Sequence, residues 1–173
     1  MNSNFDKAFD LVMKSEGGYV NDPSDRGGET NLGVTIAAWG AYLGRNIQPG
    51  EMKALTREQV KPFYKQMYWD KVKCDDLPKG VDYAVFDFAV NAGTGRAAKL
   101  LQRAVGAVDD GVIGAGTLAL VAKAFTKNLL DNFSKQKEDF YRGLAETNAS
   151  QQKFLKGWLA RVEHVHDDAI DMC

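Results

Sequence analysis

A single glutamate stands where an amphipathic segment meets two consecutive glycines. Apolar residues recur at helical spacing between Phe5 and Met13, and Gly17 and Gly18 are the expected stop signal, so the pattern predicts a helix with Glu16 in its last turn. The negative end of the helix dipole and partial burial on the apolar face would both raise the pKa of this carboxyl group. A carboxylic acid that stays protonated near neutral pH is what general-acid cleavage of a glycosidic bond requires.

Two aspartates and a threonine follow in a stretch dense in turn-forming residues. Residues 22–25 fit a type I turn with proline in second position, and residues 26–29 fit another turn. The short segments between them favour a small β-hairpin that folds back beside the end of the first helix. It would carry Asp22, Asp25 and Thr30 toward Glu16, where a carboxylate and a hydroxyl could hold and activate a water. Each also has a structural alternative, because aspartate favours turns and threonine favours strands.

Longer motifs extend this pattern over nearly the whole chain. They are Glu16-Gly17-Gly18-Tyr19, Asp22-Pro23, Asp25, Gly27-Gly28, Thr30, Gly33-Val34-Thr35, Tyr68-Trp69-Asp70, residues 87–93, Leu101-Gln102, Val105-Gly106, residues 110–114, Thr117 and residues 154–161. Together they resemble glycoside hydrolase family 108, a lysozyme-like group of phage endolysins and bacterial muramidases, followed by a predicted peptidoglycan domain. The resemblance implies cleavage of the β-1,4 bond between N-acetylmuramic acid and N-acetylglucosamine in peptidoglycan, with Glu16 as the catalytic acid.

A broader resemblance to phage-type lysozymes implies a Glu-Asp-Thr constellation. Glu16 and Asp25 have the eight-residue gap of that pattern, whereas Thr30 lies one position closer to Asp25 than the pattern requires. We therefore expect Asp25 to be the second catalytic group, with Asp22 as the alternative and Thr30 as the third member. The substrate-binding residues that we expect are Tyr19, Asp22, Thr35 and Asn91.

The rest of the chain predicts helices, and the expected fold class is α+β and mostly helical. It would be a lysozyme-like, two-lobed fold with a small β-hairpin beside the active-site cleft. We expect a catalytic lobe over residues 1–95 and a helical peptidoglycan-binding region over residues 96–173, packed onto it. The expected helices span residues 35–42, a segment starting at Thr56, and residues 81–91, 96–105, 126–146 and 150–170. Pro62 would kink the segment that starts at Thr56 or shorten its hydrogen bonding.

Local signals assign structural roles to several polar residues. Thr35 and Thr117 would cap helices, Thr56 with Gln59 would form a capping box, and Asn148 with Gln151 would cap the last helix. Asp82 and Asp87 are chemically able to catalyse, but a structural hydrogen bond of Asp87 beside Asn91 is the favoured interpretation. For Phe154 and Trp158, packing in the core is favoured over stacking on glycans, because aromatic residues at helical spacing are usually buried.

Composition excludes several other classes of protein. The 173 residues are 45% hydrophobic with a net charge of −1 and no long basic block, so nucleic acid is not an expected partner. No apolar run approaches the roughly 18 residues of a membrane span, and we expect a monomer without membrane insertion. Cys74 and Cys173 are expected to be free thiols, and His164 and His166 make a poor metal pair. We therefore expect no metal and no cofactor.

The N-terminal residues lack the basic and apolar regions of a secretory signal. We therefore expect synthesis in the cytoplasm of a host bacterium and access to the cell wall after release by a holin or another route. Two alternative functions stay open. One is a lytic transglycosylase that uses the same glutamate, and the other is a non-catalytic module that binds the cell wall.

Overall fold

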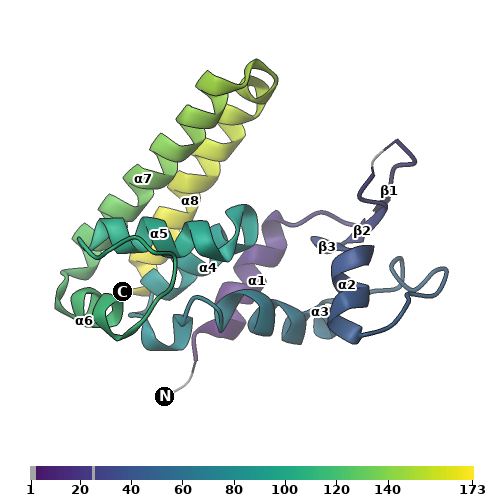
Figure 1. The fold of residues 1–173 in the computed structure, drawn as a ribbon, viewed down its shortest axis with the longest axis horizontal. Coiled ribbons are helices and arrows are strands. Elements are labelled where there is room, and N and C mark those ends of the chain that lie inside the picture. Colours follow the sequence, from purple (N-terminus) through teal and green to yellow (C-terminus); the bar gives the residue numbers. More distant parts are fainter. Residues whose placement is uncertain (1–2, 25) are drawn as a thin grey trace. The chain divides into compact units, whose positions relative to one another are not determined.

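The computed structural model describes residues 3–24 and 26–173, and these form two compact units (Figure 1). The smaller unit is Phe5–Met67, and the larger is Tyr68–Cys173 together with the start of the chain up to Asn4. Helices dominate both units, and a single small antiparallel sheet lies in the smaller one among the described residues. This confirms the predicted mostly helical α+β class. The functional division into residues 1–95 and 96–173 stays a prediction.

The smaller unit combines three helices with the sheet. Its elements are α1 (Phe5–Ser15), β1 (Val20–Asn21), β2 (Glu29–Asn31), β3 (Val34–Thr35), α2 (Ile36–Leu43) and α3 (Arg57–Tyr64). The strands are antiparallel in the order β1-β2-β3, with Thr30 opposite both Val20 and Thr35. The predicted hairpin is therefore present, and β3 extends it to three strands.

Helix α1 packs its apolar face into the unit and ends just before the candidate acid. The buried side chains are Phe5, Ala8, Phe9, Val12 and Met13. The helix ends at Ser15, so the prediction that Glu16 lies in the last turn was wrong by one residue. Each of the two glycines that follow costs about 1 kcal/mol in a helix, which favours an early end.

The caps of α2 and α3 follow the sequence signals. The Thr35 hydroxyl accepts a hydrogen bond from the Ala38 N–H at 3.1 Å, and Gly44 ends α2 with a φ of 68°. Thr56 and Gln59 form the predicted capping box of α3. Pro62 lies inside α3, and a short π-helix, η1 (Lys65–Trp69), follows it directly. Because proline lacks an N–H, the regular hydrogen-bond ladder is interrupted there, as predicted.

The larger unit is built around one buried helix. Its elements are η2 (Cys74–Asp76), α4 (Val81–Ala92), α5 (Thr94–Ala104), α6 (Ala115–Lys123), α7 (Thr126–Thr147), η3 (Ala149–Phe154) and α8 (Leu155–Met172). Every residue of α4 from Val81 to Ala89 is buried, which confirms the predicted central helix. The long helices α7 and α8 pair as an antiparallel hairpin (Figure 1). None of the described helices has the length and apolar character needed to cross a membrane.

Two predicted caps in this unit were wrong. Thr117 lies inside α6, where its hydroxyl accepts a hydrogen bond from the Gln102 amide at 3.2 Å, and Gly114 precedes the helix. Asn148 caps the short 3-10 helix η3 through the Ser150 N–H, and α8 begins only at Leu155. The Thr117 hydroxyl does not cap a helix because it is bonded to Gln102, a residue distant in sequence.

Candidate active site

The carboxyl group of Glu16 lies against the turn between β2 and β3. That turn has two central residues, Leu32 and Gly33, and both have positive φ, of 51° and 76°. This is the geometry of a type I′ hairpin turn. A Cβ atom placed on Gly33 would lie 2.5 Å from Glu16 Oε2 and would also collide with the Tyr64 hydroxyl. The missing side chain of Gly33 therefore leaves the space that the carboxyl group occupies.

Tyr64 supports this turn through its hydroxyl group. Its buried hydroxyl donates a hydrogen bond to the Leu32 carbonyl at 2.7 Å, and its ring packs edge-on against Phe9 and Phe63. A non-glycine residue at positive φ is strained, so Leu32 needs such support from its surroundings. Glu16 itself is only partly exposed. The carboxyl group thus lies against the Gly33 turn, near the Tyr64 hydroxyl, in a residue that is partly exposed.

Asp22 is engaged within its own turn. Its Oδ1 accepts hydrogen bonds from the Ser24 N–H at 2.8 Å and from the Ser24 hydroxyl at 2.6 Å. These bonds to Ser24 lower the pKa of the Asp22 carboxyl, so it stays ionised. The side chain is exposed and acts as a turn-forming aspartate. Asp25, the expected second catalytic group, lies outside the described residues.

Tyr19 pairs with a glutamate that the sequence did not single out. Its hydroxyl donates to Glu29 Oε1 at 2.6 Å, and this hydrogen bond raises the pKa of the Tyr19 phenol. Both side chains are partly exposed, and the Lys53 ammonium lies 6.0 Å from the Tyr19 ring centre. Glu29 therefore places a further carboxylate on the sheet. Tyr19 directly precedes β1 and Glu29 lies in β2, ten positions later, and no short motif encodes such a contact.

The remaining predicted residues lie in two different environments. Thr30 is partly exposed in the middle strand, and Thr35 uses its hydroxyl as the cap of α2. Asn91 belongs to the larger unit, at the C-terminal end of α4, where its amide donates to the Tyr141 hydroxyl. Asp87 lies one helical turn before Asn91, and its buried carboxylate accepts a hydrogen bond from the partly exposed Arg161 at 2.8 Å. This is the structural role that the sequence predicted for Asp87.

The smaller unit therefore brings Glu16, Gly33 and Tyr64 together, and sequence reasoning named only the first of these as a site residue. The sequence did not predict the positive φ of Leu32. The Leu-Gly pair between two short strands was the available signal, since a glycine there is typical of a hairpin turn. In the described part of the chain, no group of three or more His, Cys, Asp or Glu side chains is arranged to hold a metal ion.

Comparisons with known proteins give a consistent result. The family model described as glycosyl hydrolase 108 matches residues 9–93, and the one described as predicted peptidoglycan domain matches residues 96–163. A solved structure described as Brucella abortus SagA is 41% identical in sequence, with a TM-score of 0.85 over 99% of this chain and 97% of that chain. A search of curated proteins found no match.

Proposed function

The chain belongs to the glycosyl hydrolase 108 family and is a peptidoglycan hydrolase, and on this premise we propose that it is an N-acetylmuramidase. It would cleave the β-1,4 bond between N-acetylmuramic acid and N-acetylglucosamine, with Glu16 as the general acid. The observation that carries this proposal is the position of the Glu16 carboxyl beside Gly33 and the buried Tyr64 hydroxyl, in a residue that is partly exposed. General-acid cleavage needs a carboxyl group held where it can donate a proton to the glycosidic oxygen.

In this mechanism Glu16 protonates the glycosidic oxygen as the bond to the leaving sugar breaks. Charge then develops on the sugar ring that is left behind. Asp25 is proposed to stabilise that charge or to orient the attacking water, and Thr30 to hydrogen-bond nearby. Tyr64 and Gly33 are positioning residues, because they fix the carboxyl group without reaching the sugar themselves. A carboxyl separation of about 6.5–9.5 Å would give inversion, and about 5–5.5 Å retention.

The Glu16→Gln variant tests the acid. The amide keeps the shape of the side chain but has no proton to donate, so we expect the variant to fold normally and lose lytic activity. The measurement is the fall in turbidity of cells stripped of their outer membrane. Glu58→Gln is the matched control, because Glu58 is an exposed glutamate in the first turn of α3. Lysis by the Glu16→Gln variant would contradict the assignment of Glu16 as the general acid.

Mass spectrometry of the released muropeptides identifies the reaction. A muramidase leaves reducing N-acetylmuramic acid ends, whereas a lytic transglycosylase leaves anhydro ends because the muramyl 6-hydroxyl replaces water. Release of soluble fragments by the wild-type chain would exclude the alternative of a module that only binds the wall. Anhydro products would be consistent with Glu16 as the acid, but they would show that the reaction is transglycosylation and not hydrolysis.

A pair of variants identifies the second group. Since Asp22 is committed to its own turn, we expect Asp22→Asn to keep most of the activity and Asp25→Asn to lose it. The same turbidity assay compares the two. The opposite ranking would transfer the catalytic role to Asp22.

The route to the cell wall is also part of the proposal. We propose that the enzyme is made in the cytoplasm of a host bacterium and reaches the wall after release by a holin or another route. Bacteria that express the chain alone should stay intact, and co-expression of a holin should lyse them. Lysis without a holin would contradict this route.

A further inference from the structure

Four aromatic side chains form a continuous run through the larger unit, which we call the aromatic ladder: Phe140, Tyr141, Trp158 and Phe154. Ring centres are 5.2 Å apart for Phe140 and Tyr141, 5.0 Å for Tyr141 and Trp158, and 5.8 Å for Trp158 and Phe154. The Tyr141 and Trp158 rings are stacked at an angle of 26°. The ladder joins α7, α8 and η3.

The ladder runs from the interior to the surface. Tyr141 is 5% exposed, Trp158 is partly exposed, and Phe154 is 46% exposed. The prediction that Phe154 packs in the core was therefore wrong, because it lies in η3, between the two long helices α7 and α8, and is exposed there. Since the inner ring is buried and stacked on Trp158, the outer rings are held in place by the core.

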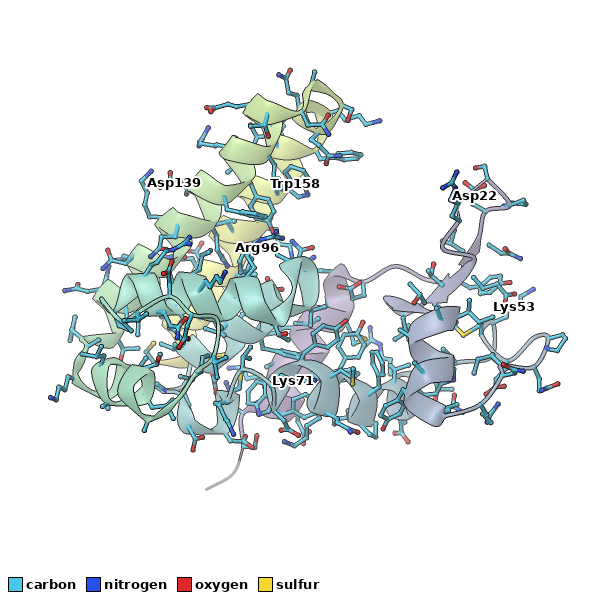
Figure 2. The ribbon with its side chains drawn as sticks, in the orientation of Figure 1. Asp22, Lys53, Lys71, Arg96, Asp139 and Trp158 are labelled. Carbon is cyan, nitrogen blue, oxygen red and sulfur yellow. The ribbon has the colours of Figure 1, made fainter. Side chains whose placement is uncertain are left out.

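Polar groups border the same run. The Lys153 ammonium lies 5.0 Å from the Phe154 ring centre, and the Arg96 guanidinium lies 4.6 Å from the Phe140 ring centre. The Asn91 amide donates to the Tyr141 hydroxyl. Figure 2 shows Trp158 on the α7–α8 hairpin and Arg96 where α5 passes the base of that hairpin. The ladder thus combines aromatic rings, some of them partly exposed, with two cations and an amide.

We propose that Phe154 and Trp158 form a stacking subsite for the glycan strand of peptidoglycan, separate from the candidate acid. A pyranose ring has an apolar face that suits an aromatic ring and a polar rim that suits bordering donors. Lys153 and Arg96 complement the carboxylates that peptidoglycan carries on its peptide stems. Both rings lie within the stretch matched by the predicted peptidoglycan domain. The choice of a glycan strand as the ligand rests on the proposed function.

The first test uses tryptophan fluorescence and needs no variant of the ladder. The chain has three tryptophans, and Trp39 and Trp69 are only 5% and 1% exposed, so Trp158 is the one that a solvent quencher reaches. Purified glycan strands freed of their peptides are added to the full chain carrying Glu16→Gln, and quenching by acrylamide is measured. We expect the strands to protect the fluorescence in a saturable manner. Unchanged quenching at strand concentrations that saturate binding would overturn the proposal.

The second test compares two exposed aromatic residues. Phe154→Ala should weaken binding of the peptide-free strands about tenfold, as expected when one aromatic anchor of a binding site is truncated. Phe125→Ala is the matched control, because Phe125 is 70% exposed in the same unit but lies outside the ladder, and this variant should bind normally. Equal affinities for the two variants would overturn the proposal, as would binding that requires the peptide stems.

These outcomes are distinguishable from a failure of the proposed function. Hydrolysis by Glu16→Gln would contradict the role of Glu16 without deciding whether Phe154 and Trp158 bind the glycan strands. Loss of strand binding in Phe154→Ala supports the subsite whichever glycosidic bond the enzyme cleaves.

Discussion

Gly33 is the residue on which the geometry of the candidate acid depends most directly. Gly33→Ala would place a methyl group onto the Glu16 carboxyl and the Tyr64 hydroxyl, at a φ of 76° that alanine disfavours. We expect a loss of stability of about 2 kcal/mol or more from strain and overpacking. Displacement of the carboxyl by about 1 Å should lower activity on the order of a hundredfold. Turbidity assays and urea denaturation measure the two effects.

Gly44→Ala is the control for the backbone effect. Gly44 has a similar φ of 68°, but a Cβ atom there would meet nothing within 4 Å. This variant should lose roughly 1 kcal/mol of stability and keep its activity. Equal activity losses in the two variants would show that the contact between Gly33 and Glu16 is unimportant.

The Tyr64 hydroxyl supports the strained Leu32. Tyr64→Phe removes the donor to the Leu32 carbonyl and keeps the ring contacts with Phe9 and Phe63. We expect a loss of about 1 kcal/mol, the usual net value of one hydrogen bond. Activity should fall more than this small change in stability explains, because the turn that positions Glu16 loosens. The comparison variant is Tyr42→Phe, whose partly exposed ring lies in the same aromatic cluster and which should retain activity.

At the scale of elements, the sequence predicted best what is decided locally. The capping box of α3 and the cap of α2 depend on residues three positions apart, and both are present. Thr117 failed as a cap because Gln102, fifteen positions away, uses its hydroxyl. The predicted burial of Phe154 was wrong for a similar reason, since burial depends on which element covers a side chain. The contact of Glu16 with Gly33 is likewise tertiary, and helical spacing could identify the acid but not its neighbours.

The capping box gives a prediction at this scale. Thr56→Ala removes the acceptor for the Gln59 N–H and should destabilise the protein by about 1 kcal/mol. Thr56→Ser keeps a hydroxyl at the same place and should restore most of that loss. Thermal denaturation of both variants is the measurement. If serine restores nothing, the hydroxyl is not what stabilises the start of α3.

At the scale of the whole molecule, a buried lysine in the larger unit carries an electrostatic cost. Lys137 is 1% exposed, and its ammonium lies 5.9 Å and 5.4 Å from the ring centres of Phe88 and Phe133. Burial lowers the pKa of Lys137 to about 8, while the nearby Asp87 opposes that shift. Asp87 is already paired with Arg161. The folded chain therefore holds a cation whose desolvation is offset by a shared carboxylate and two ring faces.

This cost makes the stability of the protein depend on pH. Below about pH 8 Lys137 is charged in both the folded and the unfolded chain, and its penalty is fully present. Between about pH 8 and the ordinary lysine pKa of about 10.4, the unfolded chain binds more protons, so the free energy of unfolding rises with pH. Burial also raises the pKa values of Tyr83 and Tyr141, which opposes this rise above about pH 10. The useful window is therefore about pH 8 to 9.5.

Lys137→Met should remove both the penalty and its pH dependence. Methionine fills a similar volume without a charge, so at pH 7 we expect the variant to be more stable than the wild type by at least about 1 kcal/mol. Urea denaturation of both proteins across the window should give a difference that shrinks as the pH rises, because only the wild type gains stability from proton release. Lys135→Met is the control, since Lys135 is exposed and paired with Asp139 at 2.8 Å, and its difference from the wild type should not shrink across this window. A variant at position 137 that is less stable at pH 7 would mean that the ammonium contributes more through Asp87 and the aromatic rings than its desolvation costs.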